Sequence, residues 1–189
     1  MDGFQNSETV NIWIIGYGNR NRRDDGVGPH VADRLKLRFG DAGRVRMVSV
    51  HQLEPEIAEA LRTSSVIIFI DSSREMLPRG GRAWSRIRPV LDMHGITHSL
   101  KAGTLLGLIL LLYDRCPDAW MVSVQGSDYD FGEGLSKSTE RSAIRVTGEV
   151  ARFIQRGLKS NSPTKAINDN DRMENNNEGF YIRSKPWPA

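Results

Sequence analysis

Short apolar runs that alternate with a helical pattern constrain the fold of this chain more than any other feature. Val10–Ile15 is apolar and β-branched and ends at Gly16, as expected of a strand buried on both faces. Ser65–Ile70 has the same character and is followed directly by Asp71. Between them, from about Gly26, apolar residues recur every four positions, which predicts an amphipathic helix. This alternation predicts an α/β domain with a mostly parallel sheet.

The rest of the chain continues the alternation. The sequence predicts further strands at Val45–Val50, Ala83–Val90 and Ala119–Val124, with the second of these at an edge of the sheet. It predicts further helices at Leu53–Leu61, Thr104–Tyr113 and Ser138–Leu158. After Leu158 the composition changes to Asn, Ser and charged residues. We therefore expect one α/β domain over residues 1–158 and a polar, disordered tail over residues 159–189.

The composition excludes several classes of protein. The formal net charge is only +3, and the basic residues form a single short cluster at positions 20–23, whereas nucleic-acid binders show a clustered basic face. The longest apolar run, Leu105–Tyr113, is far shorter than the ~20 residues of a membrane span. The N-terminus lacks a signal-peptide pattern, and the single Cys116 forms no intramolecular disulfide. We therefore expect a cytoplasmic protein without nucleic-acid or membrane partners.

Polar residues that follow the predicted strands should meet at one edge of the sheet, because ligands of open α/β sheets bind at the carboxyl ends of the strands. An imidazole and two carboxylates at such an edge suit a borderline divalent metal such as zinc, copper or nickel. The candidates are Asn19, Asp24 and Asp25 in the loop after the first strand, Asp71 after the third, and His94 and His98 before the Leu-rich helix.

Each candidate also has a structural interpretation. Asp24 or Asp25 can cap the first helix, because a carboxylate accepts hydrogen bonds from the free N–H groups of a helix N-terminus. Asp71 can cap the turn after its strand, and a histidine before a helix, such as His98, is more often structural than a ligand. The functional interpretation therefore depends on the predicted convergence of these residues.

Two other patterns are weaker. Gly16-x-Gly18 after a strand begins like a dinucleotide-binding fingerprint, but Asn21 occupies the place of the third glycine. Cys116 has neither a neighbouring base nor a feature that lowers its pKa, and the serines lie in no nucleophile elbow. The sequence therefore gives no support to serine or cysteine catalysis, and we expect no organic cofactor.

Five segments in a fixed order carry a more specific signal. They are the glycine-rich Gly16–Gly28, His51–Glu56 with the letters HQLEPE, the apolar strand Ile68–Asp71, Thr97–Leu100 with its histidine, and Phe131–Ser136 before the last helix. In this order they resemble the signature segments of the hydrogenase maturation protease family, the first of them the pattern G-x-G-N followed by D-[DE]-G-x-G. The resemblance extends from about residue 10 to residue 158.

The resemblance implies a three-layer α/β/α sandwich around a mostly parallel five-stranded sheet. It also implies an endopeptidase that removes the C-terminal extension of a [NiFe] hydrogenase large-subunit precursor after nickel insertion. By position, Asp25, Asp71 and His98 would be both the catalytic and the metal-contacting residues. The precursor would be the partner and would supply the nickel, and the family precedent suggests a monomer. The chain departs from the family at residues 20–23, so recognition of the precursor is expected to differ there.

Two rival functions share parts of this pattern. A peptidyl-tRNA hydrolase-like enzyme also opens with G-x-G-N, but it needs a catalytic histidine soon afterwards, for which His30 is the candidate. A non-catalytic maturation scaffold would sense nickel without cutting. For a protease, two routes stay open: nickel can polarise the carbonyl or activate water, or Asp25 or Asp71 can act as general base, which would make the enzyme metal-assisted or aspartic-type respectively.

Overall fold

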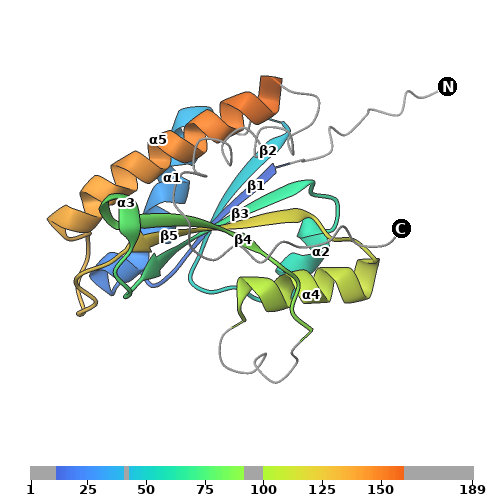
Figure 1. The fold of residues 1–189 in the computed structure, drawn as a ribbon, viewed down its shortest axis with the longest axis horizontal. Helices are drawn as coiled ribbons and strands as arrows, with labels where there is room; N and C mark the ends of the chain where they lie inside the picture. The colour runs from blue at the N-terminus through green and yellow to red at the C-terminus, as the bar shows by residue number, and fades with distance from the viewer. Residues whose placement is uncertain (1–11, 41–42, 92–99, 160–189) are drawn as a thin grey trace.

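The computed structural model describes residues 12–40, 43–91 and 100–159, and within them five strands form one sheet (Figure 1). The strands are β1 (Ile12–Tyr17), β2 (Val45–Val50), β3 (Val66–Ser73), β4 (Arg82–Ile87) and β5 (Asp118–Gln125), in the order β2-β1-β3-β5-β4. Pairing is parallel except between β4 and β5, which run antiparallel. The predicted α/β class, the mostly parallel sheet and the edge position of the fourth strand are confirmed.

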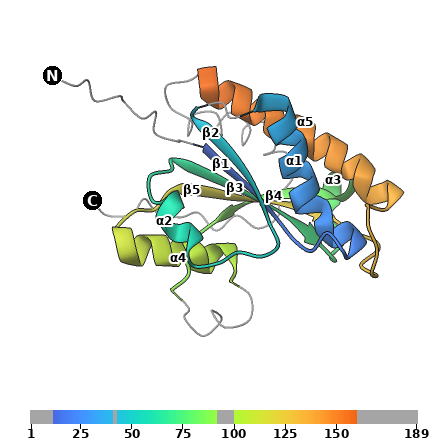
Figure 2. The ribbon, with the colours of Figure 1, turned by 180° about the vertical axis from the view of Figure 1, so that it is seen from behind.

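Helices cover both faces of this sheet. They are the 3-10 helix η1 (Arg23–Gly26), α1 (Val27–Phe39), α2 (Ile57–Leu61), the single turn α3 (Pro78–Gly81), α4 (Ala102–Tyr113) and α5 (Lys137–Lys159). Figures 1 and 2 show α1 and α5 on one face and α2 and α4 on the other. The three-layer α/β/α sandwich is therefore confirmed.

Each central strand supplies two cores, which explains why its sequence is wholly apolar rather than alternating. In β1, Ile12 and Ile14 pack toward α1 and α5, while Trp13 and Ile15 pack toward α2 and α4. In β3 the alternate residues divide between the two faces in the same way. Burying such a side chain contributes about 1.5–3 kcal/mol, so these two strands anchor both layers.

Glycines allow α1 to pack directly against the carboxyl ends of β1 and β3. A Cβ at Gly28 would lie 2.3 Å from the carbonyl oxygen of Ile70 and 2.5 Å from that of Tyr17. A Cβ at Gly16 would lie 2.0 Å from the carbonyl oxygen of Gly28. Only hydrogen atoms fit between these backbones, and the start of α1 is thereby fixed over the edge where the polar candidates were expected.

The structure corrects several strand boundaries, including the end of the fourth strand, which is Ile87 rather than Val90. β3 does not end before Asp71: it pairs with β5 as far as Ser73, opposite Gln125. Its pairing with β1 stops at Ile70, opposite Gly16. Asp71 is therefore the first residue of β3 beyond its β1 neighbour, and the interpretation of Asp71 as a cap of a following turn is wrong. β1 extends two residues beyond its predicted end, because its ladder with β2 runs to Tyr17, and its predicted first two residues lie outside the described part of the chain.

Some predictions fall outside the described residues. The helix α5 ends at Lys159, one residue later than predicted, and residues 160–189 are not described, so the expected tail stays a prediction. Within the described ranges, none of the helices is both long enough and apolar enough to cross a membrane.

Candidate functional site

The strand order places a ligand crevice between β1 and β3. From β1 the chain passes through α1 to β2 on one side, and it then crosses to β3 on the other side of β1. In open α/β sheets this reversal of direction opens a crevice at the carboxyl ends of the two strands. Asp25 lies in η1, directly after β1, and Asp71 lies in β3 just beyond its pairing with β1. Both predicted carboxylates therefore stand at the reversal.

Ser72 joins these two carboxylates. Its hydroxyl donates a hydrogen bond to Oδ1 of Asp25 at 3.2 Å, and its backbone N–H donates to Oδ1 of Asp71 at 2.7 Å. The second oxygen of Asp25 accepts a hydrogen bond from the backbone N–H of Asn19 at 2.9 Å. The predicted convergence of Asp25 and Asp71 is therefore present in the structure.

Asp71 has an electrostatically unusual setting. Burial raises the pKa of Asp71 to about 6; hydrogen bonds from the Tyr17 hydroxyl and the Ser72 amide oppose that rise, and the negative charge of Asp25 adds to it. Burial, followed by the charge of Asp71, raises the pKa of Tyr17 well above its ordinary value. Tyr17 is therefore neutral beside Asp71, and its hydroxyl also donates to Sδ of Met121 at 4.0 Å. Two carboxylates held this close attract a cation, because a positive charge between them removes their mutual repulsion.

Asp24, the other acid of the loop, has a different role from its neighbour. It is fully buried, and its carboxylate accepts hydrogen bonds from the backbone N–H groups of Ser127, Asp128 and Ser136 at 2.7–2.9 Å. The hydroxyl of Thr139 also donates to it, at 2.9 Å. Burial alone would raise the pKa of Asp24, but these hydrogen bonds outweigh burial and lower it.

The prediction that Asp24 or Asp25 caps the first helix is wrong. Gly26 is the residue before α1, and no side chain caps this helix end. Asp24 instead ties the first glycine-rich segment to the segment that precedes α5. The backbone N–H of Arg23 donates to the carbonyl of Gly132, and that of Gly132 donates to the carbonyl of Asn21. The first and the last of the five sequence segments are therefore neighbours in space.

The second segment reaches the same edge. The backbone N–H of Gly18 donates to the carbonyl oxygens of Val50 and His51, at the end of β2. Gly18 has φ of +137° and a Cβ there would lie 2.0 Å from the carbonyl oxygen of Asp25, so the turn requires glycine. This turn is what places Asp25 over the crevice.

Comparison with solved structures places this arrangement among known folds. A [NiFe] hydrogenase maturation protease HycI from Thermococcus kodakarensis KOD1 superposes with a TM-score of 0.62 at 21% identity, over 76% of this chain and 91% of that chain. The hydrogenase 2 maturation peptidase of a Thaumarchaeota archaeon gives 0.58 at 19% identity, over 77% and 98%. The hydrogenase maturating endopeptidase HybD from E. coli gives 0.59 at 16% identity, over 78% and 94%.

The chain has the fold of the [NiFe] hydrogenase maturation proteases. The fold that the sequence resemblance implied is thereby confirmed. No sequence-family description matches the chain, and no curated protein does.

His98, the third predicted metal ligand of the chain, lies outside the described residues, as does the alternative histidine, His94. Among the residues the structure describes, no three His, Cys, Asp or Glu side chains gather closely enough to hold a metal ion. The structure brings Asp25 and Asp71 together, and the assignment of Asp25, Asp71 and His98 as metal ligands stays a prediction.

Two further candidates from the sequence lie away from the acid pair. His30 is in the first turn of α1, as its helical spacing indicates, and burial followed by the nearby charge of Arg34 lowers its pKa. Cys116 precedes β5, at the opposite end of the strands, where burial and then Asp118 raise its pKa. A thiol with a raised pKa is a poor nucleophile, in agreement with the sequence interpretation.

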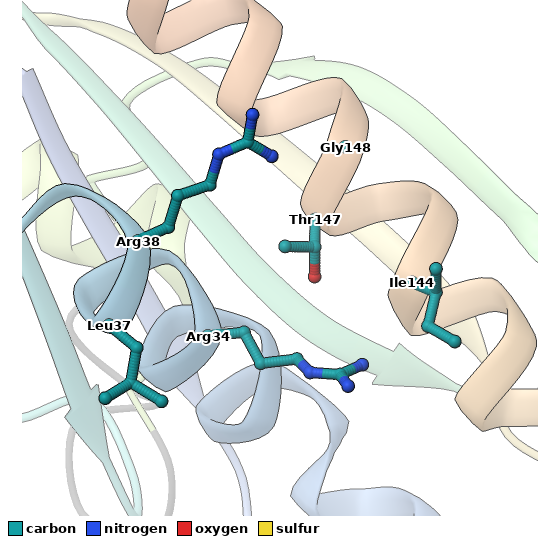
Figure 3. Close-up of a pocket in the computed structure, with 6 residues that line it drawn as sticks. All are labelled: Arg34, Leu37, Arg38, Ile144, Thr147 and Gly148. Carbon is teal, nitrogen blue, oxygen red and sulfur yellow. The ribbon is translucent and has the colours of Figure 1, made fainter.

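A hollow of about 540 Å³ lies between α1 and α5, and neither residue of the acid pair lines it (Figure 3). Arg34, Leu37 and Arg38 line it from α1, and Ile144, Thr147 and Gly148 line it from α5. Because no carboxylate lines this hollow, it does not share the chemistry of the crevice.

Sequence reasoning missed two residues of the site. Ser72 was weighed only as a nucleophile, although its place directly after Asp71 is a signal that it shares the same edge. Tyr17 was passed over as a variable position in the glycine-rich turn. As the last residue of β1 it lies beside the β1–β3 reversal, which could have indicated contact with Asp71.

Proposed function

We propose that this chain is an endopeptidase that removes the C-terminal extension of a [NiFe] hydrogenase large-subunit precursor after nickel has been inserted. The observation that carries the proposal is the pairing of Asp25 and Asp71 through Ser72 at the strand reversal of a maturation-protease fold. Several solved structures with this fold bear the names of hydrogenase maturation proteases. The five ordered sequence segments support the same assignment.

The nickel belongs to the substrate. Asp25, Asp71 and His98 would add protein ligands to an ion that the precursor already holds, and so they would dock the adjacent peptide bond at the crevice. Carboxylate and imidazole ligands suit nickel, and the repulsion between Asp25 and Asp71 gives the pair an intrinsic preference for a cation. A precursor without nickel lacks this interaction, which makes binding conditional on completed metal insertion.

Hydrolysis then needs a water molecule at the scissile carbonyl carbon. Its oxygen forms the new C–O bond, its proton passes to a base, the C–N bond breaks, and the leaving amine takes up a proton. Either an ion-bound water or a water deprotonated by Asp25 or Asp71 fits this scheme. Measuring binding apart from cleavage distinguishes the two. An Asp71→Asn variant that binds loaded precursor without cutting it identifies Asp71 as the base, whereas loss of binding identifies it as a ligand.

The proposed function is tested by incubating the protein with the large-subunit precursor from the same organism, with and without nickel. Intact mass spectrometry should show loss of a short C-terminal peptide from the loaded precursor only. A stable complex without any mass loss would instead establish a nickel-sensing scaffold. Release of the peptide from peptidyl-tRNA, with no effect on the precursor, would establish the other rival function.

A further inference from the structure

A second cavity, of about 270 Å³, opens at the same edge of the sheet as the acid pair, on the side of α5. Six of its eight lining residues carry a polar or cationic side chain. Gly80 and Gly81 of α3, Gln125 at the end of β5, Ser127, and Ser138, Arg141, Ser142 and Arg145 of α5 form its walls. Figure 1 shows α3 beside the N-terminal half of α5, and the two helices are in contact. We call this cavity the arginine pocket.

The two arginines of this pocket have no acidic partner among the residues that the structure describes. Arg141 and Arg145 make no ion pair with any side chain in the described parts of the chain. They lie one turn apart on α5, and Lys137 lies one turn earlier. Like charges at this spacing destabilise a helix. A bound anion would relieve this repulsion.

The pocket is shaped around one of these guanidinium groups. Nη1 of Arg145 lies 2.6 Å from the position that a Cβ of Gly80 would occupy, so Arg145 rests directly on the backbone of α3. Gly80 has φ of +72°, which favours glycine independently of the contact. Ser142 is buried and its hydroxyl donates to the carbonyl of Gly80 at 3.1 Å, which holds α3 against α5.

The pocket lies within reach of a peptide bound at the acid pair. Gln125, in its wall, pairs with Ser73, and Asp71 lies two residues earlier on the same strand. With about 3.3 Å per residue along a strand and about 4.8 Å between strands, the Cα atoms of Asp71 and Gln125 are roughly 8 Å apart. An extended peptide covers this distance and the depth of the pocket in about three or four residues.

We infer that the arginine pocket binds a carboxylate of the peptide extension that the enzyme removes, three or four residues from the scissile bond. This inference rests on the proposed function, in which the nickel-bearing side of the substrate occupies Asp25 and Asp71 and only the extension is free to reach the pocket. Arginine suits the role because its planar fork binds both oxygens of a carboxylate. The pocket would thus select precursors whose extension carries an acidic side chain or a chain terminus at that distance.

Direct binding tests the pocket without any need for cleavage. The probes are a fluorescein-labelled alanine–serine peptide that ends in glutamate with a free carboxylate, and the same peptide ending in glutamine amide. Fluorescence anisotropy should show that the intact protein binds the acidic peptide roughly tenfold more tightly. The double variant Arg141→Gln/Arg145→Gln should lose this preference. The control Arg152→Gln, which removes an exposed arginine of the same helix outside the pocket, should keep it.

Inorganic phosphate, added as a competitor, distinguishes a pocket for a peptide carboxylate from a pocket for free phosphate. Displacement of the acidic peptide by phosphate, with loss of both effects in the double variant, supports a carboxylate-binding pocket. Phosphate binding without any preference for the acidic peptide would overturn the assignment to a peptide carboxylate. Equal affinity of the double variant and the intact protein for the acidic peptide would overturn the pocket itself.

Cleavage of the nickel-loaded precursor provides the second arm. Neutralising the acids of the extension should raise KM roughly tenfold and leave kcat nearly unchanged, and the double variant should show the same KM for both precursors. If neutralising the acids of the extension left KM unchanged and cleavage normal, the carboxylate-binding role of the pocket would be wrong, and the proposed function would stand. Absence of cleavage combined with intact peptide preference would overturn the proposed function and leave the pocket standing.

Discussion

The hydroxyl of Ser72 donates a hydrogen bond to Oδ1 of Asp25 across 3.2 Å and so ties the loop after β1 to β3. These residues are 47 positions apart in the sequence. Because the backbone of Ser72 also holds Asp71, a single residue sets the separation of the two carboxylates. In the proposed mechanism that separation decides whether both reach one ion.

Ser72→Ala should therefore impair cleavage without unfolding the protein. The variant keeps the backbone N–H that binds Asp71 and loses the hydroxyl that donates to Asp25. We expect kcat for nickel-loaded precursor to fall roughly tenfold, as when one orienting hydrogen bond at an active site is lost. Ser73→Ala is the matched control and should cleave normally, since the Ser73 hydroxyl accepts only from the N–H of Glu75. Equal kcat values for the two variants would show that Ser72 does not position the acid pair.

Asp24→Ala should destabilise the fold strongly, because it leaves the buried N–H groups of Ser127, Asp128 and Ser136 without their acceptor. We expect the free energy of unfolding to fall by about 3–5 kcal/mol in urea denaturation. Asp130→Ala in the same loop is the control, and its exposed side chain should matter by less than about 0.5 kcal/mol. The fold lowers the pKa of Asp24, so its ionised carboxylate stabilises the protein fully at any pH above the ordinary aspartate pKa. A destabilisation that disappeared already at pH 6 would contradict this account.

Asp71 should have the opposite pH dependence. Its pKa of about 6 in the fold exceeds the ordinary value of 3.8, so the folded state binds the proton more tightly than the unfolded state. Relative to Asp71→Asn, the intact protein should therefore gain about 2 kcal/mol of stability as pH falls from 7 to 4. Urea unfolding of both proteins across this range measures the difference. If the stability of the two proteins changed with pH in parallel, the fold would not raise the pKa of the Asp71 carboxyl.

Two helical glycines should respond to alanine in opposite ways. Gly28→Ala places a Cβ against the carbonyls of Ile70 and Tyr17 and should destabilise the fold by about 3 kcal/mol, because backbone atoms would have to move. Gly148→Ala in α5 meets only a guanidinium nitrogen of Arg152 at 3.7 Å. It should stabilise by about 0.5–1 kcal/mol through helix propensity. Thermal unfolding compares the two, and similar melting temperatures would show that α1 does not depend on the close backbone contact.

The sequence predicted the layers well because local patterns determine them. The strand Val45–Val50 was predicted with the bounds of β2, and the four-residue apolar spacing placed α1 correctly. It predicted that Asp25 and Asp71 meet because the carboxyl ends of parallel strands share an edge. These inferences need only periodicity and the general rules of α/β sheets.

What the sequence did not reveal depends on contacts between distant residues. Asp24 looked like a helix cap, but its partners Ser127 and Ser136 are 103 and 112 positions away. The end of β3 was misplaced because its last residues are held by β5 alone, and pairing partners are invisible in a single strand. The arginine pocket combines α3, β5 and α5, three elements that no motif connects.

The central claim is that Asp25, Asp71 and His98 complete a nickel site that the substrate brings. Its most direct test is the intact mass of nickel-loaded precursor after incubation with the protein and with the variants Asp25→Asn, Asp71→Asn and His98→Ala, each confirmed to be folded by circular dichroism. The account predicts loss of the C-terminal peptide with the unaltered protein and none with any variant. Full processing by His98→Ala, or by either aspartate variant, would contradict it.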